Sequence, residues 1–211
     1  MEQIRIHGPD DVRMDQRETQ EPGPRDAIVA VRACGICGSD VGYVKLGGVA
    51  GPSSEPTPIG HELAGVILKT GAEVRDLSPG MRVVLNPMGG GNQIGNGGPQ
   101  GGFTPELLVP NVAAGDVLFP IPDDLSDEQA ALAEPLGVGM QAVNRSGLQP
   151  GEKAVIFGAG PIGLMALATC RYRGIEDVVV VDLSEKRLSL ARELGARATL
   201  CPSNGTLWQD L

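Results

Sequence analysis

Short runs that alternate apolar and polar residues in the first 150 positions predict β-strands. Residues 26–34 (DAIVAVRAC) alternate roughly as a half-buried strand does. Residues 61–71 and 81–87 are further short apolar runs that end at Gly or Pro. A helix is expected over 127–133, because Ser126 is a good N-cap and acidic residues follow it. The pattern therefore predicts a strand-rich first domain.

The pattern changes at residue 153, where strands and helices begin to alternate. The run DVVVVD (177–182) is almost wholly apolar, which is typical of a parallel strand covered on both faces. Ser184 is expected to cap the helix that follows it. The expected order is βαβαβ, with strands at 153–158, 177–182 and 196–200 and helices at 159–174 and 184–195. We place the boundary at the turn GLQPGEK, which divides the chain into domains 1–150 and 151–211.

The glycine-rich segment between Pro87 and Phe103, PMGGGNQIGNGGPQGGF, has no periodicity and little to bury. A mobile surface loop is therefore the expected structure.

Composition narrows the function classes. The chain has 211 residues, of which 41% are hydrophobic, enough to build a core. Its 26 acidic and 17 basic residues give a net charge of −9, which argues against nucleic acid or an anionic membrane as a partner. It contains no apolar run of about 18 residues and no apolar signal core near the N-terminus. We therefore predict a cytoplasmic protein, whose four cysteines are thiols or metal ligands.

A dinucleotide signature begins at the end of strand 153–158. Gly158, Gly160 and Gly163 form G-x-G-x-x-G, which follows a strand and opens a helix. The helix N-terminus, with Pro161 and Ile162, would face a pyrophosphate. The alternative is a glycine-rich turn that binds no ligand.

An acidic residue, Asp182, ends the next strand 19 positions after Gly163. Its carboxylate can accept hydrogen bonds from both ribose hydroxyls and repels a 2′-phosphate, so NAD is favoured over NADP. Lys186 and Arg187 lie close by in sequence, and these cations could hold a phosphate instead.

A second cluster of chemistry-bearing residues lies in the first domain. Cys34 and Cys37 have CxxC spacing, which fits a redox dithiol, half of a structural zinc site, or one ligand of a catalytic metal. His61 and Glu62 follow Gly60, in a chain with only two histidines. A lone His is usually a satisfied structural residue, but thiolate, imidazole and carboxylate together suit zinc with a fourth position open.

The stretches CGICGSD, GHELAGVILKTGAEV and FGAGPIG…VVVVD resemble the zinc-dependent medium-chain alcohol and polyol dehydrogenases of the sorbitol, threonine and butanediol type. The resemblance implies a GroES-like β-rich catalytic domain followed by the first βαβαβ half of a Rossmann NAD-binding domain. It implies that Cys37, His61 and Glu62 are zinc ligands and that Cys34 is not. Glu134, in AEPLGVG, matches a glutamate beside the metal, as an alternate ligand or a proton-relay group. Taken alone, it could equally be a helix-end carboxylate.

The resemblance also implies a reaction, the oxidation of a secondary alcohol or polyol by NAD. Zinc acts as a Lewis acid on the alcohol, and Ser39 takes the first proton. Many members have a histidine where this chain has Gly42, so Tyr43, Glu134 or water must carry the proton onward. The glycine-rich segment occupies the place of four structural-zinc cysteines in many members, so we predict one catalytic zinc and no structural zinc.

Length separates two hypotheses. The chain supplies three strands of a doubly wound domain, which leaves strand 153–158 as an exposed apolar edge. It is either a fragment of an active dehydrogenase or a truncated, non-catalytic chain that retains zinc binding or pairs with another chain. A thiol-disulfide protein is disfavoured, because the CxxC ends a strand far from any thioredoxin-like unit. A homo-oligomer stays an open alternative.

Overall fold

The computed structural model describes residues 1–202 and divides the chain into two compact units, Met1–Glu134 and Pro135 onward. The division falls at the start of helix α3 (Ala133–Ser146). The domain boundary expected at residue 150 lies just after this helix and stays a prediction.

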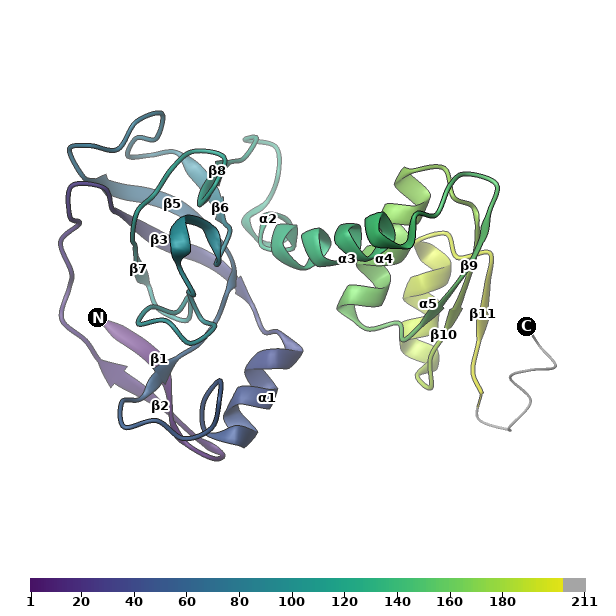
Figure 1. The fold of residues 1–211 in the computed structure, drawn as a ribbon, viewed down its shortest axis with the longest axis horizontal. Helices are drawn as coiled ribbons and strands as arrows, with labels where there is room; N and C mark the ends of the chain where they lie inside the picture. The colour runs from purple at the N-terminus through teal and green to yellow at the C-terminus, as the bar shows by residue number, and fades with distance from the viewer. Residues whose placement is uncertain (203–211) are drawn as a thin grey trace. The chain divides into compact units, whose positions relative to one another are not determined.

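The first unit contains two antiparallel sheets, seen in the purple-to-teal part of Figure 1. One sheet has the order β2-β1-β4, from β1 (Glu2–Gly8), β2 (Asp11–Gln16) and β4 (Thr57–Pro58). The other has the order β7-β3-β5-β6-β8, from β3 (Ala27–Gly35), β5 (Glu62–Thr70), β6 (Arg82–Leu85), β7 (Glu106–Val109) and β8 (Leu118–Pro120). The strands expected at 26–34, 61–71 and 81–87 are β3, β5 and β6.

The core of this unit follows the alternation of the strands. Ala27 and Val29 of β3 are fully buried, and they pack with Leu63, Ile67 and Val83 in one cluster. The two registers of β3 against β5 and β7 place one face of each strand on this core. Ile28, between Ala27 and Val29, is also buried, so both faces of β3 are covered at this end of the strand and the alternation describes only which residues join the cluster.

The glycine-rich segment differs from expectation, because it does bury apolar surface. Ile94 is only 2% exposed and belongs to the same core cluster as β3 and β5. Its backbone is also bonded within the loop, since the Ile94 N–H donates to the Pro87 carbonyl at 3.0 Å. The segment contains one short 3₁₀ turn, η1 (Gly89–Gly91). The prediction that it has little to bury is wrong, because one isoleucine among many glycines anchors the loop.

The second unit is the expected βαβαβ arrangement (Figure 1). Its parallel sheet has the order β11-β10-β9, from β9 (Lys153–Phe157), β10 (Asp177–Val181) and β11 (Ala198–Leu200). The connecting helices are α4 (Pro161–Tyr172) and α5 (Glu185–Glu193). Ile156, Val178 and Val180 face a core with Leu167 and Leu188 of these helices.

Strand β9 lies at the edge of this sheet among the described residues, as expected. Val155 is 43% exposed and Phe157 is 65% exposed, and both lie on the strand face opposite to the one packed in the core. The edge is therefore apolar as well as unpaired.

Both serines expected at helix N-termini are N-cap residues, but only Ser126 makes a side-chain capping hydrogen bond. Ser126 caps α2 (Asp127–Ala130) through a reciprocal box with Gln129, as expected, although the helix breaks before α3 begins. Ser184 occupies the N-cap position of α5, but its side chain makes no capping hydrogen bond. Its backbone N–H donates to the Asp182 carboxylate at 2.7 Å. The predicted N-cap residue is therefore confirmed by its position, and only the side-chain capping bond is missing.

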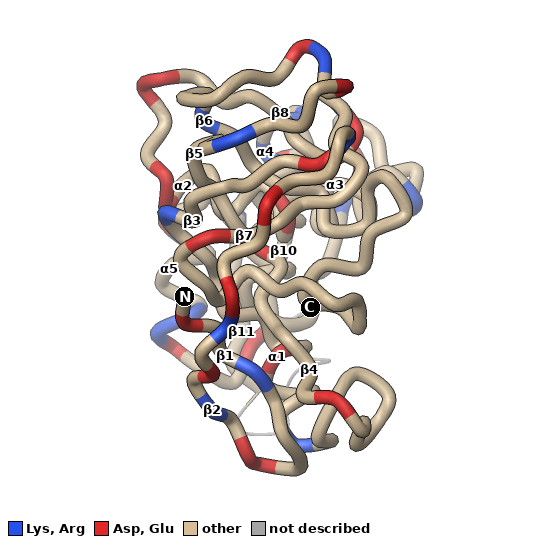
Figure 2. The backbone as a smooth tube through the Cα atoms, turned by 90° about the vertical axis from the view of Figure 1, so that its left-hand side faces the viewer, with Lys and Arg blue, Asp and Glu red and all other residues tan. Residues whose placement is uncertain are grey.

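Charged residues are interspersed along the backbone, with acidic segments more numerous than basic ones (Figure 2). In the part of the chain that the structure describes, no helix has the length and apolar character needed to cross a membrane.

Candidate metal centre and cofactor pocket

Three of the predicted ligands meet at the ends of two paired strands. Cys37 lies just beyond β3, where it precedes helix α1 (Gly38–Leu46), and Glu62 is the first residue of β5. The antiparallel register pairs Gly35 with Glu62, which brings the two segments side by side. A Cβ at Gly35 would displace the Glu62 carboxylate, so glycine there leaves room for this ligand in its present position. The strand pairing itself therefore assembles the cluster.

The donor atoms of Cys37, His61 and Glu62 all lie within 4.8 Å of one another. His61 and Glu62 are buried, and Cys37 is half-buried. The buried Nδ1 of His61 has no hydrogen-bond partner among the described residues. A buried polar atom without a partner is costly, and a sulfur, nitrogen and oxygen donor set suits a zinc ion. These residues therefore fit the metal that the sequence predicted.

Asp40 supports this cluster, and sequence reasoning gave it no role. Its side chain is 2% exposed, and one carboxylate oxygen accepts the Cys37 N–H at 2.9 Å. The other accepts the Gly60 N–H at 3.2 Å and lies 3.6 Å from the His61 Nδ1. Asp40 thus joins both ligand-bearing segments. Its position three residues after Cys37, as in a capping box, was the only local signal.

Two groups at the site have strongly shifted pKa values. Burial lowers the pKa of His61, but the neighbouring Asp40 carboxylate and Cys37 sulfur outweigh it and raise the pKa to about 9. Burial, together with the Asp40 charge, raises the pKa of the Cys34 thiol to about 12. Cys34 is therefore a neutral thiol near pH 7, whereas a metal at the site must displace a proton from His61.

The CxxC motif has a different local structure from the one expected. Besides ending β3, it opens a helix, because Cys37 is the N-cap residue of α1. The observation that the CxxC ends a strand is therefore not sufficient by itself to exclude a redox dithiol. The raised pKa of Cys34 is a better reason, because thiol–disulfide exchange needs an accessible thiolate. All four cysteines are free thiols.

Ser39 and Tyr43 lie on the first two turns of α1, four positions apart and so on one helix face. Both side chains are half-buried, and the Tyr43 hydroxyl donates to the Asn96 Oδ1 at 3.3 Å. At Gly42 a Cβ would meet nothing within 4 Å, so no other described group fills that space.

Glu134, the first-turn acidic residue of α3, is outside the three-residue cluster. Burial raises the pKa of Glu134. The charge of His61 lowers this pKa, and the charge of Glu62 raises it further. The influence of both ligands places the Glu134 carboxylate in their neighbourhood.

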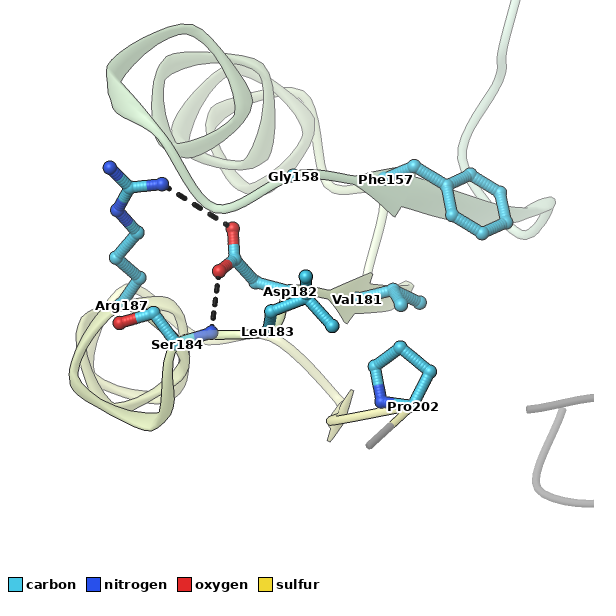
Figure 3. Close-up of a pocket in the computed structure, with 8 residues that line it drawn as sticks. All are labelled: Phe157, Gly158, Val181, Asp182, Leu183, Ser184, Arg187 and Pro202. Carbon is cyan, nitrogen blue, oxygen red and sulfur yellow. Dashed lines mark hydrogen bonds and ion pairs between the residues drawn. The ribbon is translucent and has the colours of Figure 1, made fainter. Parts of the chain in front are cut away.

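The second candidate site is a pocket of about 470 Å³ at the carboxyl ends of β9 and β10 (Figure 3). Its walls include Gly158, Asp182 and Arg187, which were predicted to bind the cofactor. Five further residues complete the lining, namely Phe157, Val181, Leu183, Ser184 and Pro202. Gly160, Pro161, Ile162 and Gly163 lie beside it at the start of α4.

The Asp182 carboxylate is held at the mouth of the glycine turn. It accepts the Ser184 N–H (Figure 3) and the Ala159 N–H, each at 2.7 Å. These two bonds, and after them the Arg187 charge, lower the pKa of Asp182. The Arg187 Nη1 lies 3.9 Å from the Asp182 Oδ2. The carboxylate is therefore ionised and oriented, and one cation lies beside it.

The three glycines of the motif have different surroundings. Gly158 has φ +98°, which favours glycine, and a Cβ at Gly163 would collide with the Gly158 carbonyl oxygen. At Gly160, the N-cap of α4, a Cβ would meet nothing within 4 Å. The fold therefore requires glycine at 158 and 163, whereas position 160 faces open space where a ligand could approach.

Comparison with known proteins finds similarity to alcohol and polyol dehydrogenases. Residues 23–123 match the family described as "Alcohol dehydrogenase GroES-like domain". The sorbitol dehydrogenase of Bos taurus is 36% identical over 214 residues, which cover 94% of this chain and 60% of that protein. The crystal structure of 2R,3R-butanediol dehydrogenase from Bacillus subtilis has a TM-score of 0.83 and 33% identity over 96% of this chain and 63% of that one. The chain is therefore similar over nearly its whole length to sorbitol and butanediol dehydrogenases, and its residues 23–123 match the GroES-like domain of alcohol dehydrogenases.

The fold class expected from the sequence is confirmed: a GroES-like catalytic domain precedes the first part of a Rossmann domain. A zinc-binding dehydrogenase from Sinorhizobium meliloti 1021, solved with NADP bound, has a TM-score of 0.85 and 31% identity over this whole chain and 64% of its own. The chain spans about 60% of the length of the relatives that it matches.

Proposed function

We propose that this chain carries the metal site and the first cofactor-binding part of a zinc- and NAD-dependent dehydrogenase for secondary alcohols or polyols. The observation that carries the proposal is the buried convergence of Cys37, His61 and Glu62. Three such ligands leave one position of a tetrahedral zinc site open, as in catalytic zinc sites. We expect one zinc per chain and no second, structural zinc.

The residues of the chain have separate roles in this proposal. Cys37, His61 and Glu62 would hold the zinc, which when bound supplies a Lewis acid that lowers the pKa of the substrate hydroxyl. Ser39 would accept the hydroxyl proton. Because Gly42 has no side chain, Tyr43, Glu134 or water would carry the proton onward. The raised pKa of Glu134 suits a proton carrier, while service as an alternate ligand remains the competing role.

Cofactor choice depends on the pocket around Asp182. The ionised carboxylate can accept hydrogen bonds from ribose hydroxyls and disfavours a 2′-phosphate, which supports NAD. Gly158, Gly160 and Gly163, with Pro161 and Ile162, would face the pyrophosphate. Two observations favour NADP instead. Arg187 lies beside the Asp182 carboxylate, and one similar structure was solved with NADP bound.

The substrate and partners follow from relatives and from charge. Relatives named for sorbitol and butanediol support a small alcohol or polyol as substrate. The negative net charge supports no nucleic-acid and no membrane partner. A homo-oligomer stays open, and a cytoplasmic location remains the prediction from sequence.

Metal analysis and a substrate panel test the proposal together. The protein should contain one zinc per chain, and it should form NADH from at least one of a set of sugar alcohols and diols. Two zincs per chain would contradict the prediction on structural zinc. One bound zinc without turnover of any alcohol would contradict the activity and leave the metal site standing.

The exposed edge of β9 supports a second candidate, a non-catalytic chain that retains zinc and pairs with another chain. Val155 and Phe157 are apolar and exposed beside unpaired backbone groups, which favours pairing. Light scattering that gives a monomer mass at all concentrations would argue against this alternative.

A further inference from the structure

We propose that the glycine-rich loop from Gly95 to Phe103 positions the ligand His61, by holding the peptide that precedes it. The inference rests on the proposed metal site. It adds that a segment without any ligand of its own determines where one of the three ligands lies.

The loop lies directly on the backbone of Ile59 and Gly60. The Gly102 N–H donates to the Gly60 carbonyl at 2.7 Å, and the Phe103 N–H donates to the Ile59 carbonyl at 3.2 Å. Asn96 forms an isolated β-bridge with Ile59. Because Gly60 is bonded to His61, these contacts restrict the backbone from which the imidazole projects.

Close approach explains why the loop is rich in glycine at these positions. A Cβ at Gly95 would collide with the Gly60 carbonyl oxygen, and one at Gly101 would lie 2.6 Å from the Ile59 carbonyl oxygen. A Cβ at Gly102 would lie 3.1 Å from the Gly60 oxygen. Three glycines thus leave room for the same two-residue segment, which is the use of glycine where two backbones meet.

The opposite side of the same peptide is held by the helix that follows Cys37. The Gly60 N–H donates to the Asp40 carboxylate, and Asp40 also accepts the Cys37 N–H. Gly60 therefore has its N–H tied to one ligand segment and its carbonyl tied to the loop. The burial of Ile94 in the core fixes the loop in turn. A displaced loop would move His61 relative to Cys37.

The test compares Gly95→Ala with a matched control, Gly91→Ala. Both glycines are in the same segment and have positive φ, +66° and +78°, so alanine is strained at each. At Gly91, however, a Cβ would meet nothing within 4 Å. We expect both variants to lose some thermal stability. Only Gly95→Ala should weaken zinc binding, by about tenfold or more, and shift the visible absorption bands of bound Co²⁺.

Each outcome decides the inference. If the wild-type protein binds metal and Gly95→Ala has the same affinity and Co²⁺ spectrum, the loop does not position His61, and the metal site stands. If the wild-type protein binds no metal, the site and the inference both fail. Should Gly95→Ala not fold, Gly102→Ala replaces it. A smaller weakening is expected, because its Cβ would lie 3.1 Å from the Gly60 carbonyl oxygen, while its nearest contact, at 2.5 Å, is the end of the Leu63 side chain. Unchanged affinity in that variant overturns the inference.

Discussion

The metal centre and the cofactor pocket are assembled in different ways by one chain. Gly158 and Asp182 meet because β9 and β10 are adjacent parallel strands joined by a single helix, with Phe157 paired to Val181. His61 and Cys37 meet at the end of an antiparallel pair, and Asp40 and a loop from further along the chain hold them there. The pocket is thus a product of local order, whereas the metal centre depends on supports distant in sequence.

This difference has an experimental consequence. Changes to residues that are not ligands, such as Asp40, should damage the metal centre, because its backbone is held from outside. The cofactor pocket should respond mainly to changes within its own motif and at Asp182.

Loss of a ligand should have the largest effect. Cys37→Ala removes one of three donors, so zinc affinity should fall by more than the roughly 10- to 100-fold that loss of a supporting hydrogen bond costs. Cys34→Ala should leave zinc bound, because Cys34 lies outside the cluster of Cys37, His61 and Glu62. Metal content after dialysis measures both. Equal zinc loss from the two variants would show that the division of the CxxC is wrong.

Removal of Asp40 should come next. Asp40→Ala leaves the buried N–H groups of Cys37 and Gly60 without an acceptor, at about 1–3 kcal/mol each. We expect the free energy of unfolding of the metal-free protein to fall by about 2–4 kcal/mol in urea titrations. Asp40→Asn keeps one acceptor oxygen and should lose less. Equal stability of Asp40→Ala and wild type would remove Asp40 from the description of the site.

The glycine motif allows a matched pair in the second unit. Gly163→Ala should destabilise that unit by about 1–3 kcal/mol, because its Cβ collides with the Gly158 carbonyl. Gly160→Ala has room for its Cβ and should leave stability unchanged while it weakens NADH binding. Hydrogen exchange and NADH fluorescence titration separate the two effects. The reverse pattern would contradict the roles assigned here.

The pH dependence should distinguish free from metal-bound protein. The pKa of His61, raised to about 9 in the folded state, means that protonated His61 stabilises the metal-free protein below about pH 6.5. That contribution is lost as the pH rises through about 9. Because metal must displace the His61 proton as well as the proton of the Cys37 thiol, apparent zinc affinity should increase by about tenfold per pH unit or more up to about pH 9. Calorimetry in buffers of different ionisation enthalpy measures the released proton, and affinity independent of pH would contradict this.

The smallest expected change is at Asp182. Asp182→Asn removes the charge that disfavours a 2′-phosphate and leaves Arg187 beside the pocket. NAD binding should weaken by roughly tenfold, as for loss of a charge-assisted hydrogen bond, and the preference for NAD over NADP should narrow. Titration with both cofactors checks this. A preference unchanged by the substitution would place cofactor choice elsewhere.

The second unit was predictable almost element by element. Its strands are continuous apolar runs, its helices end at glycine, and its ligand motif has a defined spacing, so short windows of sequence contain most of the information. Ser184 is the N-cap of α5 as expected, without a side-chain capping bond. The sequence did not predict that its backbone N–H donates to the Asp182 carboxylate. This hydrogen bond is part of the cofactor pocket, and the helix-capping preferences of residues do not predict it.

In the first unit, strands β3, β5 and β6 and the ligand types were predicted, whereas helix α1, the bounds of the other strands and the contacts that hold the ligands were not. The glycine-rich segment looked featureless because glycines bury no side chains of their own. Their contacts are with the backbone of Ile59 and Gly60, far back along the chain. Asp40 was overlooked for the same reason, since its partner Gly60 is on another segment.

By itself, the sequence determined the βαβαβ order of the second unit, three strands of the first, the glycine motif with its acidic partner, and the residue types of a zinc site, because these follow from residue types and their spacing along the chain. Only the tertiary structure decided that Cys37, His61 and Glu62 converge, that Asp40 ties two of their segments, and that a loop of glycines packs against the third. Such contacts depend on strand register and on the close approach of two backbones. Neither has a signature in local composition.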